Sequence, residues 1–217
     1  FNDYRFNIIL KARQLGISTI TAAYVVWLMM FHRSKNVLVV ATKYHTAANL
    51  VKKVKAIIQY LPEWIQMAKV IVDNRASFEL SNGSQIKASS TSVDAGRSEA
   101  LSLLVVDEAA HVDGLEELWT GLYPTISTGG RCIALSTPNG VGGWFFKTYI
   151  DSEARRNDFH PTKLLWDVHP DRDQNWFEKE TKNMSIRQIA QELECNFNTS
   201  GETVIHLSLI HISEPTR

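Results

Sequence analysis

The sequence has few of the features that mark whole classes of proteins. It holds only two cysteines, Cys132 and Cys195, with neither a Cys-x-x-Cys pair nor a histidine spacing typical of zinc sites. So little cysteine is typical of a reducing compartment, and two buried thiols are expected. The 23 basic and 23 acidic residues balance. No global positive field therefore indicates nucleic acid, and any contact with DNA requires a local basic patch.

Long apolar runs are also lacking. The longest, from Ile20 to Phe31, is interrupted by Thr21 and falls short of the roughly 18 residues that a membrane span needs. No signal peptide is visible, so no membrane partner is expected. Hydrophobic residues make up 44% of the 217 positions, which is enough for one sizeable globular core.

Both ends of the sequence indicate a fragment. The chain begins at Phe1 rather than Met, and its last residues, Leu207–Arg217, read LSLIHISEPTR, which is similar to a translated sequencing adapter. Residues 206–217 are therefore expected to be a non-native tail outside the fold. A genuine polar C-terminal tail is the alternative.

Apolar runs of strand length alternate with helical patterns along the chain. They lie at Phe6–Leu10, Val37–Ala41, Leu101–Val106 and Cys132–Ser136. Between the second and third, Tyr44–Tyr60 carries apolar residues at spacings of three and four, with lysines on the other face, which predicts an amphipathic helix. This alternation predicts an α/β fold with a mainly parallel central sheet flanked by helices.

Shorter elements are expected around this core. Turn sequences at Asp73-Asn74 and Asn82-Gly83 predict small hairpin strands, which are Val70–Asp73, Ser77–Leu80 and Gln85–Ala88. The chain after Gly143 is expected to form helices around Trp144–Asn157, Asn175–Asn183 and Ser185–Cys195, with a strand near Lys163–Trp166. We therefore expect a core over residues 1–143 and a small helical or mixed C-terminal subdomain over residues 144–205.

The first strand runs into a loop, Lys11 to Thr19, and then into a helix that is apolar almost all round. This is the context of a P-loop, where backbone N–H groups and a helix N-terminus bind phosphate, a small residue allows close approach, and a hydroxyl binds Mg²⁺. Gly16 and Ser18 fit the last two roles. The usual motif nevertheless fails twice, because Lys11 replaces its first glycine and Ile17 replaces its lysine.

A cation must still offset the charge on a transferred phosphoryl group. Lys11 and Arg13 are the only basic residues in the loop, so one of them is expected to substitute for the lysine. The alternative is a strand-to-helix turn in which Gly16 relieves crowding and Ser18 caps the helix. The remaining candidates for phosphate binding are Gln14, Leu15, Gly16, Ile17, Ser18 and Thr19.

An apolar strand ends in two adjacent carboxylates, Asp107 and Glu108. In a parallel sheet that end of a strand faces the ligand crevice. Asp107 is the candidate Mg²⁺ ligand, and Glu108 the candidate general base that activates water. A solvated loop start is the alternative for this pair.

Two further polar sites lie near these motifs. Ser136 and Thr137 follow another apolar strand, where they could sense a γ-phosphate, although Thr137-Pro138-Asn139-Gly140 is also an ordinary turn sequence. Arg97 precedes the acidic strand in a loop of small residues and could stabilise transition-state charge. A surface arginine is the alternative there.

Five stretches, in order, resemble the ATPase domain of terminase large subunits, the DNA-packaging enzymes of tailed phages. They read KARQLGIST, NVLVVAT, SSTSVDAGRSEALSLLVVDEAAHV, ALSTPNGVGGWF, and WDVHPDRD with QELECNFNTSGETVI. The resemblance covers Phe6 to Ile205. It implies a P-loop NTPase fold and a ring-forming, Mg²⁺-dependent motor that hydrolyses ATP to drive double-stranded DNA into a procapsid. It also implies portal protein and small terminase subunit as partners, and a place in the host cytoplasm and, transiently, at the procapsid portal.

The same resemblance implies roles for particular residues. A basic residue at the start of the loop matches Lys11, and the loop arginine matches Arg13. Asp107 matches the Mg²⁺-site aspartate and Glu108 the catalytic glutamate. The remaining correspondences are Ser136-Thr137 with the motif that couples hydrolysis to motion, and Arg97 with an intersubunit arginine finger. The family's adenine-contacting segment would precede Phe1 and its nuclease domain would follow Ile205, so neither is expected here.

Two other functions stay open. A helicase-like nucleic-acid ATPase is suggested by the sequence Asp107-Glu108-Ala109-Ala110, although a helicase needs a second motor-like domain. A degenerate nucleotide-binding or scaffold domain is suggested by Ile17 in place of lysine. Three histidines, His111, His160 and His169, match no metal-ligand spacing together with the nearby aspartates and are expected to be loop and surface residues.

Overall fold

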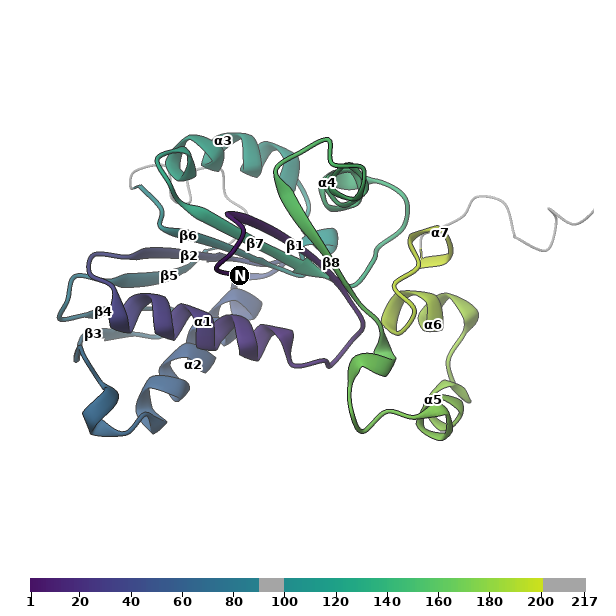
Figure 1. Cartoon of the computed structure of the whole chain (residues 1–217), viewed down its shortest axis with the longest axis horizontal. Coiled ribbons are helices and arrows are strands. Elements are labelled where there is room, and N and C mark those ends of the chain that lie inside the picture. Colours follow the sequence, from purple (N-terminus) through teal and green to yellow (C-terminus); the bar gives the residue numbers. More distant parts are fainter. Residues whose placement is uncertain (90–99, 201–217) are drawn as a thin grey trace, which may run out of the picture.

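The computed structural model describes residues 1–89 and 100–200. Arg97 and the tail expected over residues 206–217 lie outside these ranges. A single eight-stranded sheet forms the middle layer, with helices on both faces (Figure 1). The predicted α/β class with a mainly parallel sheet is confirmed.

The elements follow the predicted order, except that the helix at Leu115–Ser127 was not among the expected elements. The strands are β1 Phe6–Lys11, β2 Asn36–Val40, β3 Val70–Asn74, β4 Ser77–Leu80, β5 Gln85–Ser89, β6 Leu103–Asp107, β7 Arg131–Ser136 and β8 Phe159–Leu164. The helices are α1 Ile17–Phe31, α2 Tyr44–Tyr60, α3 Leu115–Ser127, α4 Gly143–Glu153, α5 Gln174–Thr181, α6 Ile186–Glu192 and α7 Phe197–Ser200. Short 3₁₀ turns lie at Glu63–Ile65, Ala109–His111 and Trp166–Val168.

The order of strands across the sheet is β3-β4-β5-β2-β6-β7-β1-β8. In this spatial order, each pair of neighbouring strands from β5 across to β8 is parallel. Strand β4 is antiparallel to both β3 and β5. The predicted hairpin strands thus join the main sheet through the parallel pair of β5 and β2. Strand β7 therefore lies between β1, which leads into the predicted P-loop, and β6, which ends in the two carboxylates.

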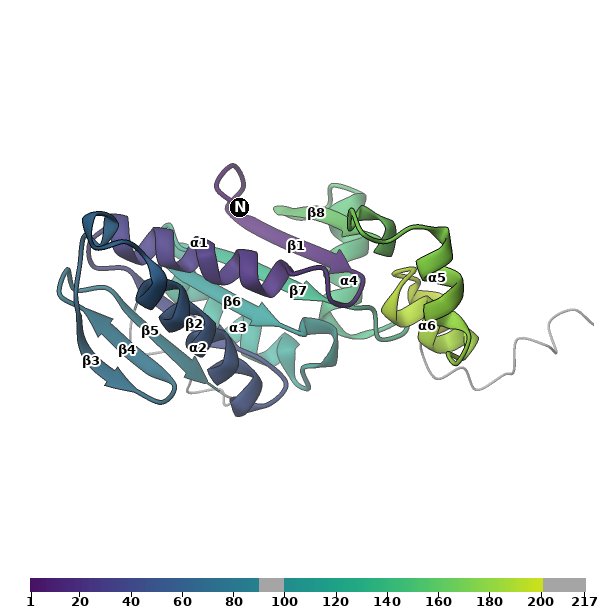
Figure 2. The same ribbon diagram turned by 90° about the horizontal axis from the view of Figure 1, so that it is seen from below.

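Two apolar cores cover the two faces of the sheet. Successive side chains of a strand point to opposite faces, so Ile8 and Leu10 of β1 belong to one core and Ile9 to the other. The core with Ile9 is covered by α1 and α2, and the other by α3 and α4 (Figures 1 and 2). In β2, β6 and β7, which are apolar on both sides, the polar residues lie at the strand ends.

The sheet continues past the boundary expected at residue 143. The strand expected near Lys163–Trp166 lies at Phe159–Leu164 and pairs in parallel with β1 as an edge strand. Phe197 of α7 packs against Phe145, Phe146 and Tyr149 of α4. Residues after 143 therefore complete the core sheet, because β8 covers the free side of β1. Helices α5 to α7 lie at the carboxyl end of β8 (Figure 1).

Within residues 1–89 and 100–200, no helix is long and apolar enough to cross a membrane. Cys132 and Cys195 are both buried and free, as predicted. Burial raises the pKa of the Cys195 thiol to about 12.

Gly130, which leads into β7, is packed too tightly for any side chain. An added Cβ would lie 2.2 Å from the carbonyl oxygen of Leu101 and 2.5 Å from Cγ2 of Ile126. Because the first contact is with a backbone oxygen and Ile126 lies in α3, the segment around Leu101, the start of β7 or the end of α3 must shift. We expect Gly130→Ala to lower the free energy of unfolding by about 1–3 kcal/mol. Chemical denaturation measures this, with the exposed neighbour Thr128→Ala as a control expected within about 0.5 kcal/mol of wild type. Equal stability of the two variants would contradict the prediction.

Candidate functional site

The strand registers bring the predicted polar residues to one edge of the sheet. Leu10 of β1 is level with Ser136 of β7, and Leu135 of β7 is level with Asp107 of β6. Lys11, Thr137 and Glu108 therefore leave three neighbouring parallel strands at the same carboxyl edge, where ligands bind in such sheets.

A pocket of about 470 Å³ opens at this edge. This volume lies within the range of roughly 300–1,000 Å³ that is usual for small-ligand sites. Four of the predicted site residues line it: Lys11, Arg13, Glu108 and Thr137. The structure thus brings together residues from the loop after β1, the end of β6 and the end of β7.

Six residues of the pocket were not predicted to belong to a site. They are Thr42, Lys43, His45, Thr46, His111 and Glu192. The first four follow β2, whose Val40 is level with Val106 of β6. The rule that ligands bind at the carboxyl ends of parallel strands could have indicated them. Nothing in the local sequence indicates Glu192, which comes from the end of α6.

Helix α1 begins at Ile17, with Gly16 as its N-cap at φ 77° and ψ 3°. No atom lies within 4 Å of a Cβ built on Gly16, so glycine is favoured there by its left-handed backbone rather than by crowding. Ser18 does not cap the helix, which corrects that detail of the structural alternative. Its hydroxyl donates instead to Oδ2 of Asp107 at 3.2 Å.

The start of the loop is tied to the C-terminal part of the chain. The amide of Ala12 donates to the carbonyl of Leu164, and that of Arg13 to the carbonyl of Glu192, both at 2.7 Å. The N–H groups at the start of a helix have no partner within it. Within this loop, as the structure describes it, the amides from Gln14 to Ser18 have no backbone hydrogen bond and are the candidates for binding an anion.

The side chains of the loop point to different surroundings. Leu15 and Ile17 pack against the two apolar cores, so the position where a P-loop usually has its lysine is turned to the protein interior. The hydroxyl of Thr19 accepts a long hydrogen bond, 3.5 Å, from Nζ of Lys53 on α2. Because Ile17 packs against apolar residues, a lysine at position 17 would have to turn its charged group away from the core.

Asp107 and Lys11 form the buried charged centre of the site. Asp107 is only 8% exposed, and burial raises the pKa of its carboxyl, an effect that the nearby Lys11 ammonium partly opposes. Burial likewise lowers the pKa of Lys11, against the opposing charges of Asp107 and Glu108. A buried carboxylate next to a hydroxyl is a set of hard oxygen donors of the kind that Mg²⁺ prefers. The pair of Ser18 and Asp107 thus fits this ion.

Glu108 has a left-handed backbone, φ 56° and ψ 38°, at the end of β6. Its own amide donates to Oδ1 of Asp107 at 3.0 Å. Its carboxylate, on an exposed residue that lines the pocket, accepts from the hydroxyl of Thr42 at 3.2 Å. The reversed backbone therefore turns the second carboxylate of the pair out of the sheet and into the pocket.

Ser136 and Thr137 are bonded to the turn that follows the carboxylates. The buried hydroxyl of Ser136 accepts from the amide of Ala110 at 3.1 Å. The hydroxyl of Thr137 lies 3.2 Å from Nε2 of His111. The end of β7 is thus linked to the segment next to Glu108, and His111 belongs to the pocket rather than to an ordinary surface loop.

The two candidate cations have different surroundings. Arg13 is 67% exposed at its side chain and lies 3.5 Å from the carboxylate of Glu192. Lys11 is half-buried beside Asp107 and Glu108. The geometry thus places Lys11 at the centre of the site and Arg13 at its rim.

The remaining histidines are not assembled into a metal centre. His160 stacks on Tyr4 with ring centroids 3.7 Å apart, and His169 lies 3.9 Å from Asp171. Among the residues that the structure describes, no group of three or more His, Cys, Asp or Glu side chains is arranged to hold a metal ion.

Comparison with known proteins gives a family and several similar structures. A family model described as terminase large subunit, T4likevirus-type, N-terminal, matches residues 8–212. The large terminase ATPase domain of Thermus phage P74-26 superposes with a TM-score of 0.71 at 19% identity, over 89% of each chain. The large terminase of another thermophilic bacteriophage, solved in complex with ADP, gives a TM-score of 0.73 at 12% identity over 90% of this chain and 49% of its own. At these identities the likeness shows a shared fold.

Proposed function

The chain belongs to the family of terminase large subunits, and on that premise we propose that its pocket binds ATP and hydrolyses it to drive double-stranded viral DNA into a procapsid. One observation supports this most directly. Ser18 at the start of α1 and Asp107 at the end of β6, 89 positions apart in the sequence, meet in a hydrogen bond of 3.2 Å. Hydroxyl and carboxylate from these two motifs are the pair that a P-loop ATPase uses around its metal ion.

The phosphates of ATP bind to the loop before α1. The amides from Gln14 to Ser18 and the N-terminus of the 15-residue helix α1 favour negative charge. Lys11 supplies the cation from inside the pocket, and Arg13 adds charge at the rim. One large terminase of the same fold has been solved both with ADP and with ATP-γ-S, which supports a nucleotide as the ligand.

Ser18 and Asp107 would hold Mg²⁺, which when bound supplies positive charge to the β- and γ-phosphates. Glu108 accepts a proton from the attacking water, because it is the carboxylate that faces the pocket. The hydrogen bond from Thr42 holds the glutamate side chain in that direction. The buried Asp107 would thus bind the metal ion, and the exposed Glu108 would activate the water.

Membership of the same family also suggests which residues take part in motion and in assembly with other subunits. Ser136 and Thr137 couple hydrolysis to movement, and their bonds to Ala110 and His111 are the contacts that would transmit it. Arg97 acts as an arginine finger in the site of a neighbouring subunit of a homo-oligomeric ring. Portal protein and small terminase subunit are the expected protein partners, in the host cytoplasm. Membership of the terminase family favours this motor over a helicase-like ATPase.

A phosphate-release assay tests the proposed function. We expect the chain to hydrolyse ATP with Mg²⁺, to lose that activity in EDTA and to regain it when Mg²⁺ is restored. Ser18→Ala should raise the Mg²⁺ concentration needed for half-maximal rate about tenfold or more, because one oxygen ligand is lost. Thr128→Ala removes an exposed hydroxyl far from the pocket and serves as the control.

A wild-type chain that binds ATP without hydrolysing it would favour the degenerate nucleotide-binding alternative. Hydrolysis at full rate in EDTA would contradict the metal assignment alone.

A further inference from the structure

An arginine from the segment between β8 and α5 grips the loop before α1. Nη1 of Arg172 donates to the carbonyl oxygen of Arg13 at 3.1 Å, and Nη2 donates to the carbonyl oxygen of Gln14 at 3.2 Å. The guanidinium fork therefore spans two successive peptide groups of the loop, from a residue 159 positions away in the sequence. The nucleotide pocket itself does not include Arg172 among its lining residues.

The fork is held in place by the aromatic residues around it. The guanidinium lies over the ring of Trp176, 4.5 Å from its centroid, and Trp176 stacks on Trp166 at 6.0 Å. Asp173 caps α5 by accepting from the amide of Trp176 at 2.8 Å. Stacking and capping restrict the rotamers of Arg172, so less conformational freedom is lost when its two hydrogen bonds form.

We infer that Arg172 is a positioning residue for the phosphate-binding amides of the loop, an inference that rests on the proposed ATP site. In a planar trans peptide the C=O and the following N–H point in opposite directions. Holding the carbonyls of Arg13 and Gln14 toward Arg172 therefore turns the N–H groups of Gln14 and Leu15 away from it. These are the first two amides that the loop can offer to a phosphate, since those of Ala12 and Arg13 are already bonded.

The composition of the loop explains why such a clamp is useful. Between Lys11 and Thr19 it has a single glycine, Gly16. Gln14 nevertheless has a φ of 58°, a conformation that costs a non-glycine residue free energy unless its surroundings enforce it. The two hydrogen bonds from Arg172 reach the carbonyl oxygens of Arg13 and Gln14, which belong to the peptide groups on either side of the Gln14 Cα. A glycine would adopt this backbone conformation without strain. With glutamine at this position, the contacts of Arg172 help to enforce it.

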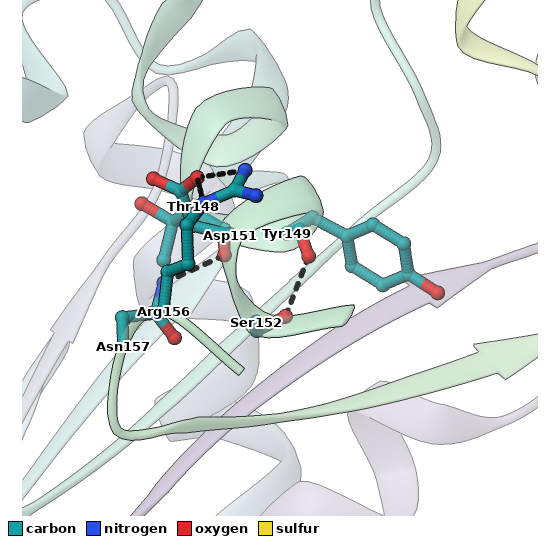
Figure 3. A network of polar contacts seen from close by, with 6 residues as sticks. All are labelled: Thr148, Tyr149, Asp151, Ser152, Arg156 and Asn157. Atoms are coloured by element: carbon teal, nitrogen blue, oxygen red, sulfur yellow. Dashed lines mark hydrogen bonds and ion pairs between the residues drawn. The ribbon is translucent and has the colours of Figure 1, made fainter. Parts of the chain in front are cut away.

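The inference is tested with Arg172→Ala and Arg172→Lys, and with Arg156→Ala as a matched control. Arg156 is bound to the Asp151 carboxylate of α4 (Figure 3), with its Nε and Nη2 donating to Oδ1 at 2.9 Å and 2.6 Å. We expect Arg172→Ala to raise the Kd for a fluorescent ATP analogue and the KM for ATP about tenfold, since hydrogen bonds of a charged donor are lost. The kcat should change less than about threefold, because these amides bind ground state and transition state alike.

Arg172→Lys separates positioning from charge. Lysine keeps the positive charge but cannot span two carbonyls with a planar fork. It should therefore bind the analogue nearly as weakly as the alanine variant. Full rescue by lysine would overturn the positioning role in favour of a simple charge effect.

Hydrogen exchange of the Ala12 and Arg13 amides, measured without nucleotide, provides a readout that does not depend on ATP binding. We expect faster exchange in both Arg172 variants and no change in Arg156→Ala. Unchanged exchange overturns the clamp. A wild type that binds the analogue, beside an Arg172→Ala variant that binds equally well, overturns this inference and leaves the proposed function intact. A wild type that binds no nucleotide overturns the proposed function and this inference with it.

Discussion

Replacing Glu108 with glutamine is expected to abolish ATP turnover, with a fall in kcat of about 100- to 10,000-fold, and to leave ATP binding nearly unchanged. The glutamine amide has the size of the carboxylate and can still accept the hydrogen bond from Thr42. It cannot take a proton from water at neutral pH. The loop before α1, Lys11 and Asp107 are untouched by the change, so the loss should fall on the chemical step.

The measurement pairs steady-state phosphate release with equilibrium binding of a fluorescent ATP analogue. Asp113→Asn is the matched control, because Asp113 is an exposed acidic residue a few positions further along that does not line the pocket. That variant should turn over at the wild-type rate. If Glu108→Gln hydrolyses ATP as fast as the control, another group activates the water and the assignment of the general base is wrong.

The second large effect is expected from Lys11→Ala, which should lower kcat/KM for ATP about 100-fold or more. Lys11 is the half-buried cation of the pocket, next to Asp107 and Glu108. Its removal leaves two carboxylates close together without a compensating charge, and it removes the donor proposed for the phosphates. Weaker binding should account for much of the loss.

Arg13→Ala provides the comparison, because both candidates for the missing lysine lie in the same loop. Arg13 is exposed and already paired with Glu192, so its removal should weaken ATP binding less than that of Lys11. Lys52→Ala, on the exposed face of α2, controls for the loss of a positive charge elsewhere. A larger defect in Arg13→Ala than in Lys11→Ala would assign the substitute cation to Arg13 instead.

Most elements of this fold are visible in the local pattern of the sequence. The helix expected at Tyr44–Tyr60 has those bounds in the structure, and the predicted strands differ from the observed ones by a few residues at their ends. Periodicity of apolar residues reports which side of an element is buried, and it is a property of neighbouring positions. The strand at Phe159–Leu164 lies a few residues earlier than the sequence indicates. Its alternation is weak, because most of its side chains are only partly buried at the edge of the sheet.

The candidate site was predictable where its residues lie at strand ends. Lys11, Asp107, Glu108 and Thr137 could be grouped because parallel strands bring their carboxyl ends to one edge. Thr42 and Lys43 could have been grouped by the same rule. Glu192 and Arg172 could not, since no local pattern says which distant carbonyl or guanidinium a side chain will meet.

The sequence by itself determined the order of the elements, the edge of the sheet that carries the polar residues, and the family. Only the tertiary structure decided that β7 lies between the P-loop strand and the acidic strand, that Ser18 bonds Asp107 instead of capping its helix, and that Ile17 faces the interior. It also decided that the loop is gripped by Arg172. The physical reason is the range of the interactions. Periodicity and capping act over a few residues, whereas strand order and side-chain contacts depend on packing between segments that the chain alone keeps far apart.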